Sequence, residues 1–177
     1  MAGDIKRSES NDKHVAKKRT SVQFIQQGSN KKTTQVSATV LKRISFGGQS
    51  HIAHEIPVEK KIALIKNGVS KNDLNEIKAE SDLDYDTLSN ILSVSRAKLI
   101  NKKGAEKFDQ TTSERIMLLA DVVAYGQSVF EDKDTFNEWM KKTNMALGNQ
   151  TPLELMDTIY GIQEVKKEIG RIEYGVF

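Results

Sequence analysis

Apolar side chains recur at helical spacing over most of the chain after about residue 56. Ile162, Val165, Ile169 and Ile172 lie three or four residues apart, which places them in one stripe on a helix. From Thr111 to Phe130 the apolar positions nearly encircle a helix, which is typical of a helix buried between two layers. No sustained stripe occurs before about residue 55. The pattern therefore predicts an all-α body behind a mostly disordered tail.

Glycines and capping residues mark where the helices should begin and end. Capping boxes are expected at Ser70/Asp73, Thr111/Glu114 and Thr151/Glu154, because each hydroxyl can accept a hydrogen bond from the backbone three residues on. The expected helices run from Pro57 to Asn67, from Ser70 past Ile77, from Thr111 to Phe130, from Thr135 to Lys142 behind an Asp134 cap, from Pro152 to about Asp157, and from Ile162 onward, with stops or breaks at Gly68, Gly104, Gly148 and Gly161.

The segment before Pro57 gives weaker signals. Alternating apolar positions suggest a short extended piece around Thr34–Ile44, and Gly47-Gly48 marks a flexible joint. His51 and His54 have the spacing of a metal-ligand pair, but no further His or Cys is nearby. We therefore expect no metal site there.

Residues 85–103 have the pattern of a helix-turn-helix. Leu88 and Leu92 face inward on the first helix, and Leu99 anchors the second. Ser93 falls at the turn between the two helices. Val94 fills the angle between the two helices.

The second helix of this motif is basic, with no acid between residues 93 and 103. Arginine can form paired hydrogen bonds to guanine, and lysines hold phosphates. Position 95 caps the helix, and positions 96, 97 and 101 are where base edges could be reached. The candidate DNA-binding residues are Ser95, Arg96, Ala97, Lys98, Asn101, Lys102 and Lys103.

Charge is distributed unevenly. Residues 1–54 hold ten Lys/Arg and three Asp/Glu, a net charge of +7, whereas the remainder has a net charge of −4. Basic arms can contact nucleic acid, although they are also ordinary solubilising tails. An acidic cluster between residues 73 and 86 is read as a solvated helix face.

The composition provides little material for catalysis. There is no cysteine, and all three histidines precede residue 55. No nucleophile-and-base set and no phosphate-binding glycine loop is visible. We therefore expect a non-enzyme without cofactor or metal. The polar N-terminus and the lack of a long apolar run predict a cytoplasmic protein without a membrane span.

The C-terminal stretch carries a longer motif: Asn144-x-Ala146-Leu147-Gly148-x-x-Thr151-Pro152-Leu153-Glu154-Leu155, then Gly161 and Val165, then Gly170-Arg171-Ile172-Glu173-Tyr174-Gly175-Val176. This motif resembles the toxin-binding domain of Xre/MbcA/ParS-type antitoxins. The resemblance extends back to about Asp82, a little over half of the chain. It also includes an Xre-like helix-turn-helix, in which the position of Ser93 is commonly glycine. The resemblance therefore implies a left-handed turn at Ser93, which costs a serine about 1–2 kcal/mol.

The resemblance implies an antitoxin of a type II toxin–antitoxin module. Such a protein neutralises a RES-domain, NAD-depleting toxin through its C-terminal domain and represses its own operon. It implies a homodimer within a larger hetero-oligomer, and a core-packing role for Trp139. The chain end is apolar, as interface anchors are. The candidate toxin-binding residues are Ile169, Arg171, Ile172, Glu173, Tyr174, Val176 and Phe177.

The predicted organisation is a basic tail at 1–55, a helix-turn-helix domain at 56–108, and a toxin-binding and dimerisation domain at 109–177. Two alternatives remain open. One is a free-standing transcriptional regulator or partition-type protein whose C-terminal domain only dimerises. The other is an adaptor whose helix-turn-helix no longer binds DNA, in which case steep salt-dependent DNA binding would be absent.

Overall fold

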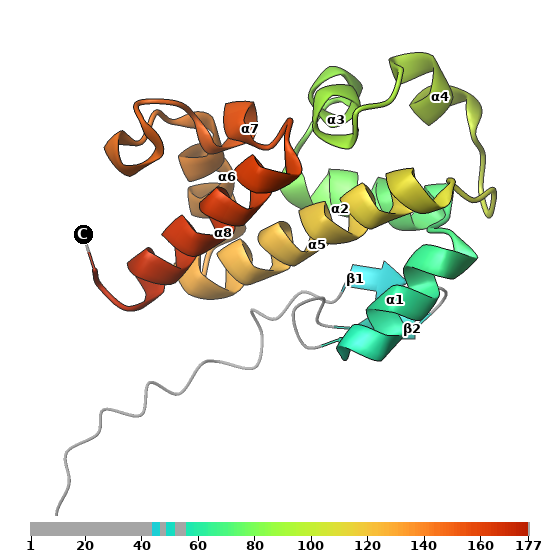
Figure 1. The fold of residues 1–177 in the computed structure, drawn as a ribbon, viewed down its shortest axis with the longest axis horizontal. Helices are drawn as coiled ribbons and strands as arrows, with labels where there is room; N and C mark the ends of the chain where they lie inside the picture. The colour runs from blue at the N-terminus through green and yellow to red at the C-terminus, as the bar shows by residue number, and fades with distance from the viewer. Residues whose placement is uncertain (1–43, 47–48, 52–55, 177) are drawn as a thin grey trace, which may run out of the picture. The chain divides into compact units, whose positions relative to one another are not determined.

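The computed structural model describes residues 44–46, 49–51 and 56–176, all within one compact unit (Figure 1). No helix in these ranges is long and apolar enough to cross a membrane. In chain order the elements are β1 (Ile44–Phe46), β2 (Gln49–His51), α1 (Val58–Asn67), α2 (Lys71–Ser81), α3 (Tyr85–Leu92), α4 (Arg96–Asn101), α5 (Gln110–Phe130), α6 (Lys133–Lys141), the 3-10 turn η2 (Met145–Leu147), α7 (Pro152–Leu155) and α8 (Ile159–Glu173).

The all-α prediction is confirmed for residues 56–176. Part of the segment expected to be disordered instead forms a short antiparallel hairpin, in which Ile44 of β1 is opposite His51 of β2. Ile44, the last residue of the expected extended piece, lies in β1. The rest of that piece, the Gly47-Gly48 joint and His54 lie outside the described residues.

Helix α5 is the centre of the fold. It contacts α1, α2, α3, α6 and α8, which belong to both halves of the predicted body (Figure 1). Leu119 and Val122 are completely buried, and polar Gln127 is buried with them. This is the arrangement expected for a helix that is apolar on most sides. The predicted central helix is confirmed.

Two of the three predicted capping boxes form as expected. Ser70 and Asp73 cap α2 reciprocally, and Thr151 and Glu154 do the same for α7. The prediction for α5 was wrong, because Asp109 caps it by accepting from the Thr112 N–H at 3.0 Å. This places Thr111 inside the helix, two residues after the cap.

The starts of α6 and α8 also differ from the prediction. Asp132, not Asp134, caps α6 by accepting from the Thr135 N–H at 2.6 Å. Helix α8 begins at Ile159 behind a Thr158 cap, three residues before the expected start. In both helices the cap lies earlier in the chain than expected. About one turn of helix precedes the first buried large apolar residue, which is Phe136 in α6 and Ile162 in α8.

Gly161 does not break a helix, as was expected, but lies in the first turn of α8. A Cβ at this position would be 1.8 Å from the carbonyl oxygen of Leu155. Glycine is therefore required by the close passage of α7 past α8. A second close approach occurs at Gly126 of α5, where a Cβ would be 2.0 Å from the ring of Phe136.

Aromatic rings from α5 and α6 pack together beside Gly126. The ring centroids of Phe130 and Trp139 are 5.3 Å apart, and those of Phe136 and Trp139 are 6.1 Å apart in a stacked arrangement. Phe136 is completely buried, while Trp139 is half-buried. The core-packing role expected for Trp139 is confirmed.

One carboxylate on α5 holds two other helices. Lys61 of α1 forms an ion pair with Asp121 at 2.7 Å, and Lys166 of α8 lies 3.9 Å from the other carboxylate oxygen. The Lys61 and Asp121 side chains are both largely shielded from solvent. Removal of either partner of such a shielded pair strands the other charge, so the pair fixes α1 on α5.

Candidate functional site

The helix-turn-helix consists of α3, a tight turn and α4. Ser93 has φ 51° and ψ 44°, which is the left-handed conformation predicted for it. Val94 is half-buried against the core, and Leu99 is completely buried. Leu88 and Leu92 are buried on α3. The turn geometry and its inward-facing residues are thus as expected.

Helix α4 presents most of the candidate DNA-binding residues to solvent. Ser95 caps it by accepting from the Lys98 N–H at 3.2 Å. Arg96, Ala97 and Asn101 are exposed, and only Leu99 of the helix is buried. The helix is shorter than expected and ends at Asn101, so Lys102 and Lys103 follow it instead of lying on it.

Two of the basic side chains have carboxylate partners. Arg96 lies 3.1 Å from Asp86 of α3, and both side chains are well exposed. Lys98 lies 2.5 Å from Asp109, the cap of α5. The Lys98 ammonium and the Thr112 N–H hold the pKa of the Asp109 carboxyl well below its usual range. A phosphate would have to replace these carboxylates to engage Arg96 and Lys98.

The candidate toxin-binding residues separate into buried and exposed groups along the end of α8. Ile169 is completely buried, so its side chain belongs to the core of the unit and not to its surface. Ile172 is half-buried. Arg171 donates to Glu168, which is itself buried. The sequence placed all of these on one surface because a terminal apolar stripe has the same pattern whether it packs inward or binds a partner.

Beyond this turn the chain end is exposed. Tyr174 is 79% exposed and Val176 60%, whereas Phe177 lies outside the described residues. Tyr125 of α5 donates to Glu173 at 2.5 Å and so fixes the last turn of α8. Burial and this hydrogen bond raise the pKa of Tyr125 to about 12. The phenol therefore remains a donor over the whole physiological range.

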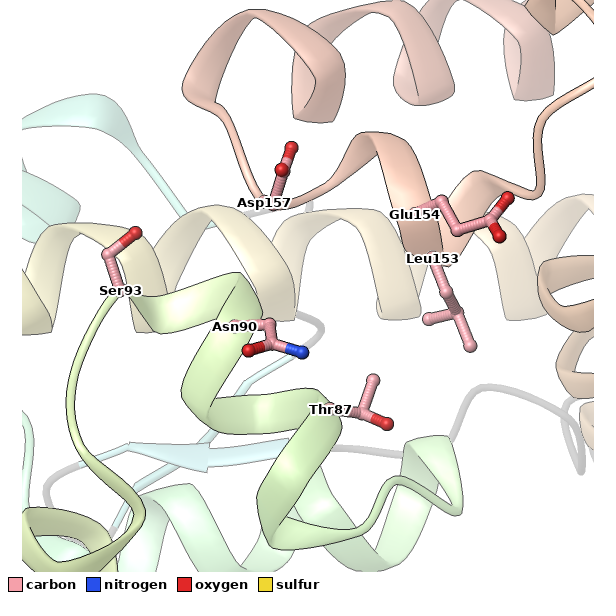
Figure 2. Close-up of a pocket in the computed structure, with 6 residues that line it drawn as sticks. All are labelled: Thr87, Asn90, Ser93, Leu153, Glu154 and Asp157. Atoms are coloured by element: carbon pink, nitrogen blue, oxygen red, sulfur yellow. The ribbon is translucent and has the colours of Figure 1, made fainter.

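A cleft of about 520 Å³ separates α3 from α7. Figure 2 shows three polar residues on the α3 wall facing three residues from α7 and the bend after it. The sequence did not predict this cleft, since its walls come from segments distant in the chain and Glu154 was recognisable only as part of a capping box. The lining residues are Thr87, Asn90, Ser93, Leu153, Glu154 and Asp157.

Arg115 of α5 joins the two walls of this cleft. Its Nη1 donates to the backbone oxygen of Ile91 at 2.9 Å and to that of Asp157 at 3.1 Å. One side chain thereby links the end of α3 to the bend before α8. Among the described residues, no group of three or more His, Asp or Glu side chains could hold a metal ion.

Comparison with known proteins finds a recognised domain in the C-terminal part of the chain. The family model of the antitoxin Xre/MbcA/ParS C-terminal toxin-binding domain matches residues 126–175, which run from the second half of α5 to the end of α8. The chain is 29% identical over 132 residues to the Prs ADP-ribosylating antitoxin of Sphingobium sp. (strain YBL2), a match that covers 68% of this chain and 82% of that protein.

It is also 38% identical over 74 residues to the antitoxin Xre of Photorhabdus laumondii, which covers 41% of this chain and half of that protein. A family of antitoxins is in accord with the prediction that the chain is not an enzyme. Residues 126–175 thus resemble the C-terminal toxin-binding domain of Xre/MbcA/ParS antitoxins, and the chain as a whole is similar to two antitoxins.

Proposed function

We propose that the protein neutralises a RES-domain, NAD-depleting toxin through its C-terminal domain and represses its own operon through α3 and α4. In this proposal it acts as a homodimer within a larger toxin–antitoxin complex. The family match over residues 126–175 and the two antitoxin relatives support the toxin-binding part. The exposed surface of α4 supports the DNA-binding part.

The observation that carries the toxin-binding proposal is the exposed end of α8. Tyr174 and Val176 are large apolar residues in water, directly after a turn that the Tyr125–Glu173 hydrogen bond holds in place. An aromatic anchor on a fixed support loses little entropy on binding, which is typical of residues that dominate interface energies. Arg171 and Glu173 flank this anchor and provide charges for polar contacts.

Point variants test this anchor better than a truncated chain does. Removing residues 171–177 would delete the last turn of α8 together with the anchor. Tyr174→Ala with Val176→Ala should weaken binding of the co-expressed product of the neighbouring gene by at least about a hundredfold, as two central anchors are lost. Growth rescue should fail in parallel. Tyr160→Ala is the matched control, since Tyr160 is 71% exposed at the opposite end of the same helix.

The toxin's chemistry should be followed by two readouts in the same cells. A RES-domain toxin of the expected kind lowers cellular NAD, and the wild-type chain should restore it. The name of the Sphingobium relative refers to ADP-ribosylation, so modified proteins should be measured as well. If the double variant neutralises the toxin as well as the wild type does, the anchor is misplaced.

DNA binding should be measured on the promoter fragment of the protein's own operon over a range of salt concentrations. Phosphate contacts make log Kd depend linearly on log salt, with a slope that reports the number of contacts. Lys102→Ala with Lys103→Ala should reduce this slope by about two and weaken binding to all sequences. Arg96→Ala should instead relax preference for the operator. Lys142→Ala, an exposed lysine of the C-terminal half, is the control.

The free-standing regulator remains the competing function. It would bind the operator with the same salt dependence but would capture no toxin. Failure of the full chain to bind the neighbouring gene product, together with operator binding, would favour it. Toxin binding without any salt-dependent DNA binding would favour an adaptor whose helix-turn-helix only supports the fold.

A further inference from the structure

Helix α1 is attached to the rest of the body along a narrow strip. None of its ten residues is buried, and its inward contacts come from half-buried Leu64 and Ile65 and from the Lys61–Asp121 ion pair. Val58 and Ile62 are large apolar residues in the first turns of this helix. They are 66% and 47% exposed. These two branched side chains form a small apolar patch on α1 that the described residues leave exposed to solvent.

The outer residues of α1 follow the pattern of a helix pair. Val58, Ile62 and Ile65 are spaced four and three residues apart, which is the spacing of the apolar seam between two packed helices. Val58 and Ile62 are the exposed members, and half-buried Ile65 lies at the edge of the seam, where it also packs on the core. Glu59 follows the first residue of this seam, and Lys66 follows the last. The two residues are seven positions apart, so they lie on the same flank of the seam, one near each end of the helix. Both are exposed.

We propose that α1 is a homodimer contact, in which it packs antiparallel against α1 of a second copy of this chain. Glu59 of one copy then lies beside Lys66 of the other, and the two-fold axis passes close to Ile62. This inference rests on the homodimer of the proposed function and assigns it a place on the molecule.

The charges select both the partner and the direction. In a parallel pair the two copies of this flank lie on opposite sides of the seam, so Glu59 and Lys66 do not face each other and contribute no attraction. In an antiparallel pair both ends are attractive, and the symmetry of the dimer produces the contact twice. A surface that is apolar at its middle and oppositely charged at its ends is complementary to itself. This self-complementarity points to a second copy as the occupant.

The contact is small. A ten-residue helix is about 15 Å long, so two such helices bury less than the roughly 1,200 Å² of a standard interface. A pair held by α1 alone is therefore weak. Its population should rise with concentration over roughly the micromolar range, and it should strengthen when toxin or operator DNA holds two copies together.

The first test is a charge exchange measured by sedimentation velocity of the full chain over a concentration series. Glu59→Lys and Lys66→Glu should each weaken the dimer by roughly tenfold, because each turns two attractive pairs into repulsive ones. The double exchange should restore most of the affinity. If the single changes acted only by destabilising α1, the double exchange would be the weakest dimer of the three, because each change places its charge unfavourably in the dipole of α1 and the two effects would add.

The second test locates the axis, and the absence of native cysteine allows single thiols to be placed. Ile62→Cys should cross-link to itself with a short bismaleimide. Val58→Cys should not, because its two copies lie at opposite ends of the pair. Met145→Cys, at the most exposed large apolar residue among those described, controls for random collision. Each variant is first checked for unchanged thermal unfolding.

The outcomes separate the two claims. A dimer that forms without Ile62→Cys cross-linking, or that ignores the charge exchange, overturns the α1 contact and leaves the homodimer in place. A chain that remains monomeric throughout the series overturns both. Toxin capture is measured independently, so its loss would count against the proposed function and not against this contact.

Discussion

Gly126 lies inside α5, about one turn before its C-terminal end, where a glycine costs a helix about 1 kcal/mol relative to alanine. The ring of Phe136 occupies the space in which any side chain would begin. The close approach of α6 to α5 therefore outweighs the helix propensity of this position. Gly170 of α8 is a useful contrast, because a Cβ there would be 3.3 Å from the hydroxyl of Tyr125, a contact that a slight shift of the side chain relieves.

Substitution by alanine should destabilise the fold strongly at Gly126 and only slightly at Gly170. Gly126→Ala should lower the free energy of unfolding by about 1–3 kcal/mol, because a buried ring must move. Gly170→Ala should change it by less than about 1 kcal/mol. Denaturant unfolding of both variants measures the difference. Gly126→Ala combined with Phe136→Leu should recover part of the loss, and no recovery would mean that the ring is not the obstacle.

Ser93 shows what single residues reveal before a structure is known. Its left-handed conformation was implied by the resemblance to Xre-type helix-turn-helix motifs, in which this position is commonly glycine, and the structure has it. The burial of Ile169 did not follow, because an apolar stripe near a chain end has the same periodicity on a core and on an interface. The hydrogen bonds of Arg115 could not be predicted either, since its acceptors are the backbone oxygens of Ile91 and Asp157, which are distant in sequence.

At the scale of whole elements, a helix start depends on which of several neighbouring acceptors the packing selects. Thr111 with Glu114 and Asp109 with Thr112 both satisfy the capping pattern at the start of α5. Asp109 is used, because it also pairs with Lys98 and so joins the cap of α5 to the preceding helix α4. That choice depends on a tertiary contact, which local pattern alone does not contain. Helix existence and type were therefore predictable here, and cap positions less so.

The Asp109 cap predicts an acid-sensitive step in stability. The pKa of its carboxyl is lowered, first by the Lys98 ammonium and then by the Thr112 N–H, so the unfolded chain binds a proton more readily than the folded one. The contribution is present above the ordinary pKa of 3.8 and is lost as the pH falls below it. Asp109→Asn keeps an acceptor for the cap but cannot titrate. Thermal unfolding measured between about pH 6 and pH 2 should show a flatter acid limb for this variant. An unchanged limb would assign the acid sensitivity to other carboxylates.

At the scale of the molecule, α5 contributes to the cores of both predicted domains. It packs on α2 and α3 of the helix-turn-helix half and on α6 and α8 of the toxin-binding half. The family match itself begins at Gly126, inside this helix. Because both halves share this central helix, neither has a complete core of its own. The predicted division at residue 109 was based on sequence motifs, which are continuous stretches of chain and carry no information on shared packing.

Residues 56–176 should therefore unfold in one cooperative transition. Calorimetry should give a single peak whose calorimetric and van't Hoff enthalpies agree. Hydrogen exchange should find the slowest amides of both halves opening with the same free energy. Two separated transitions would contradict this expectation and would favour independent domains that meet at residue 109.

The bridge made by Arg115 has a consequence for how such proteins can exchange parts during evolution. Its side chain satisfies one backbone oxygen in α3 and another before α8, so recombination near residue 109 transfers the donor with one half and leaves the acceptor at Ile91 with the other. A chimaera whose incoming half lacks arginine at this position loses that hydrogen bond at the junction. A C-terminal half that replaces this one therefore keeps the contact to Ile91 only if it also carries arginine at position 115.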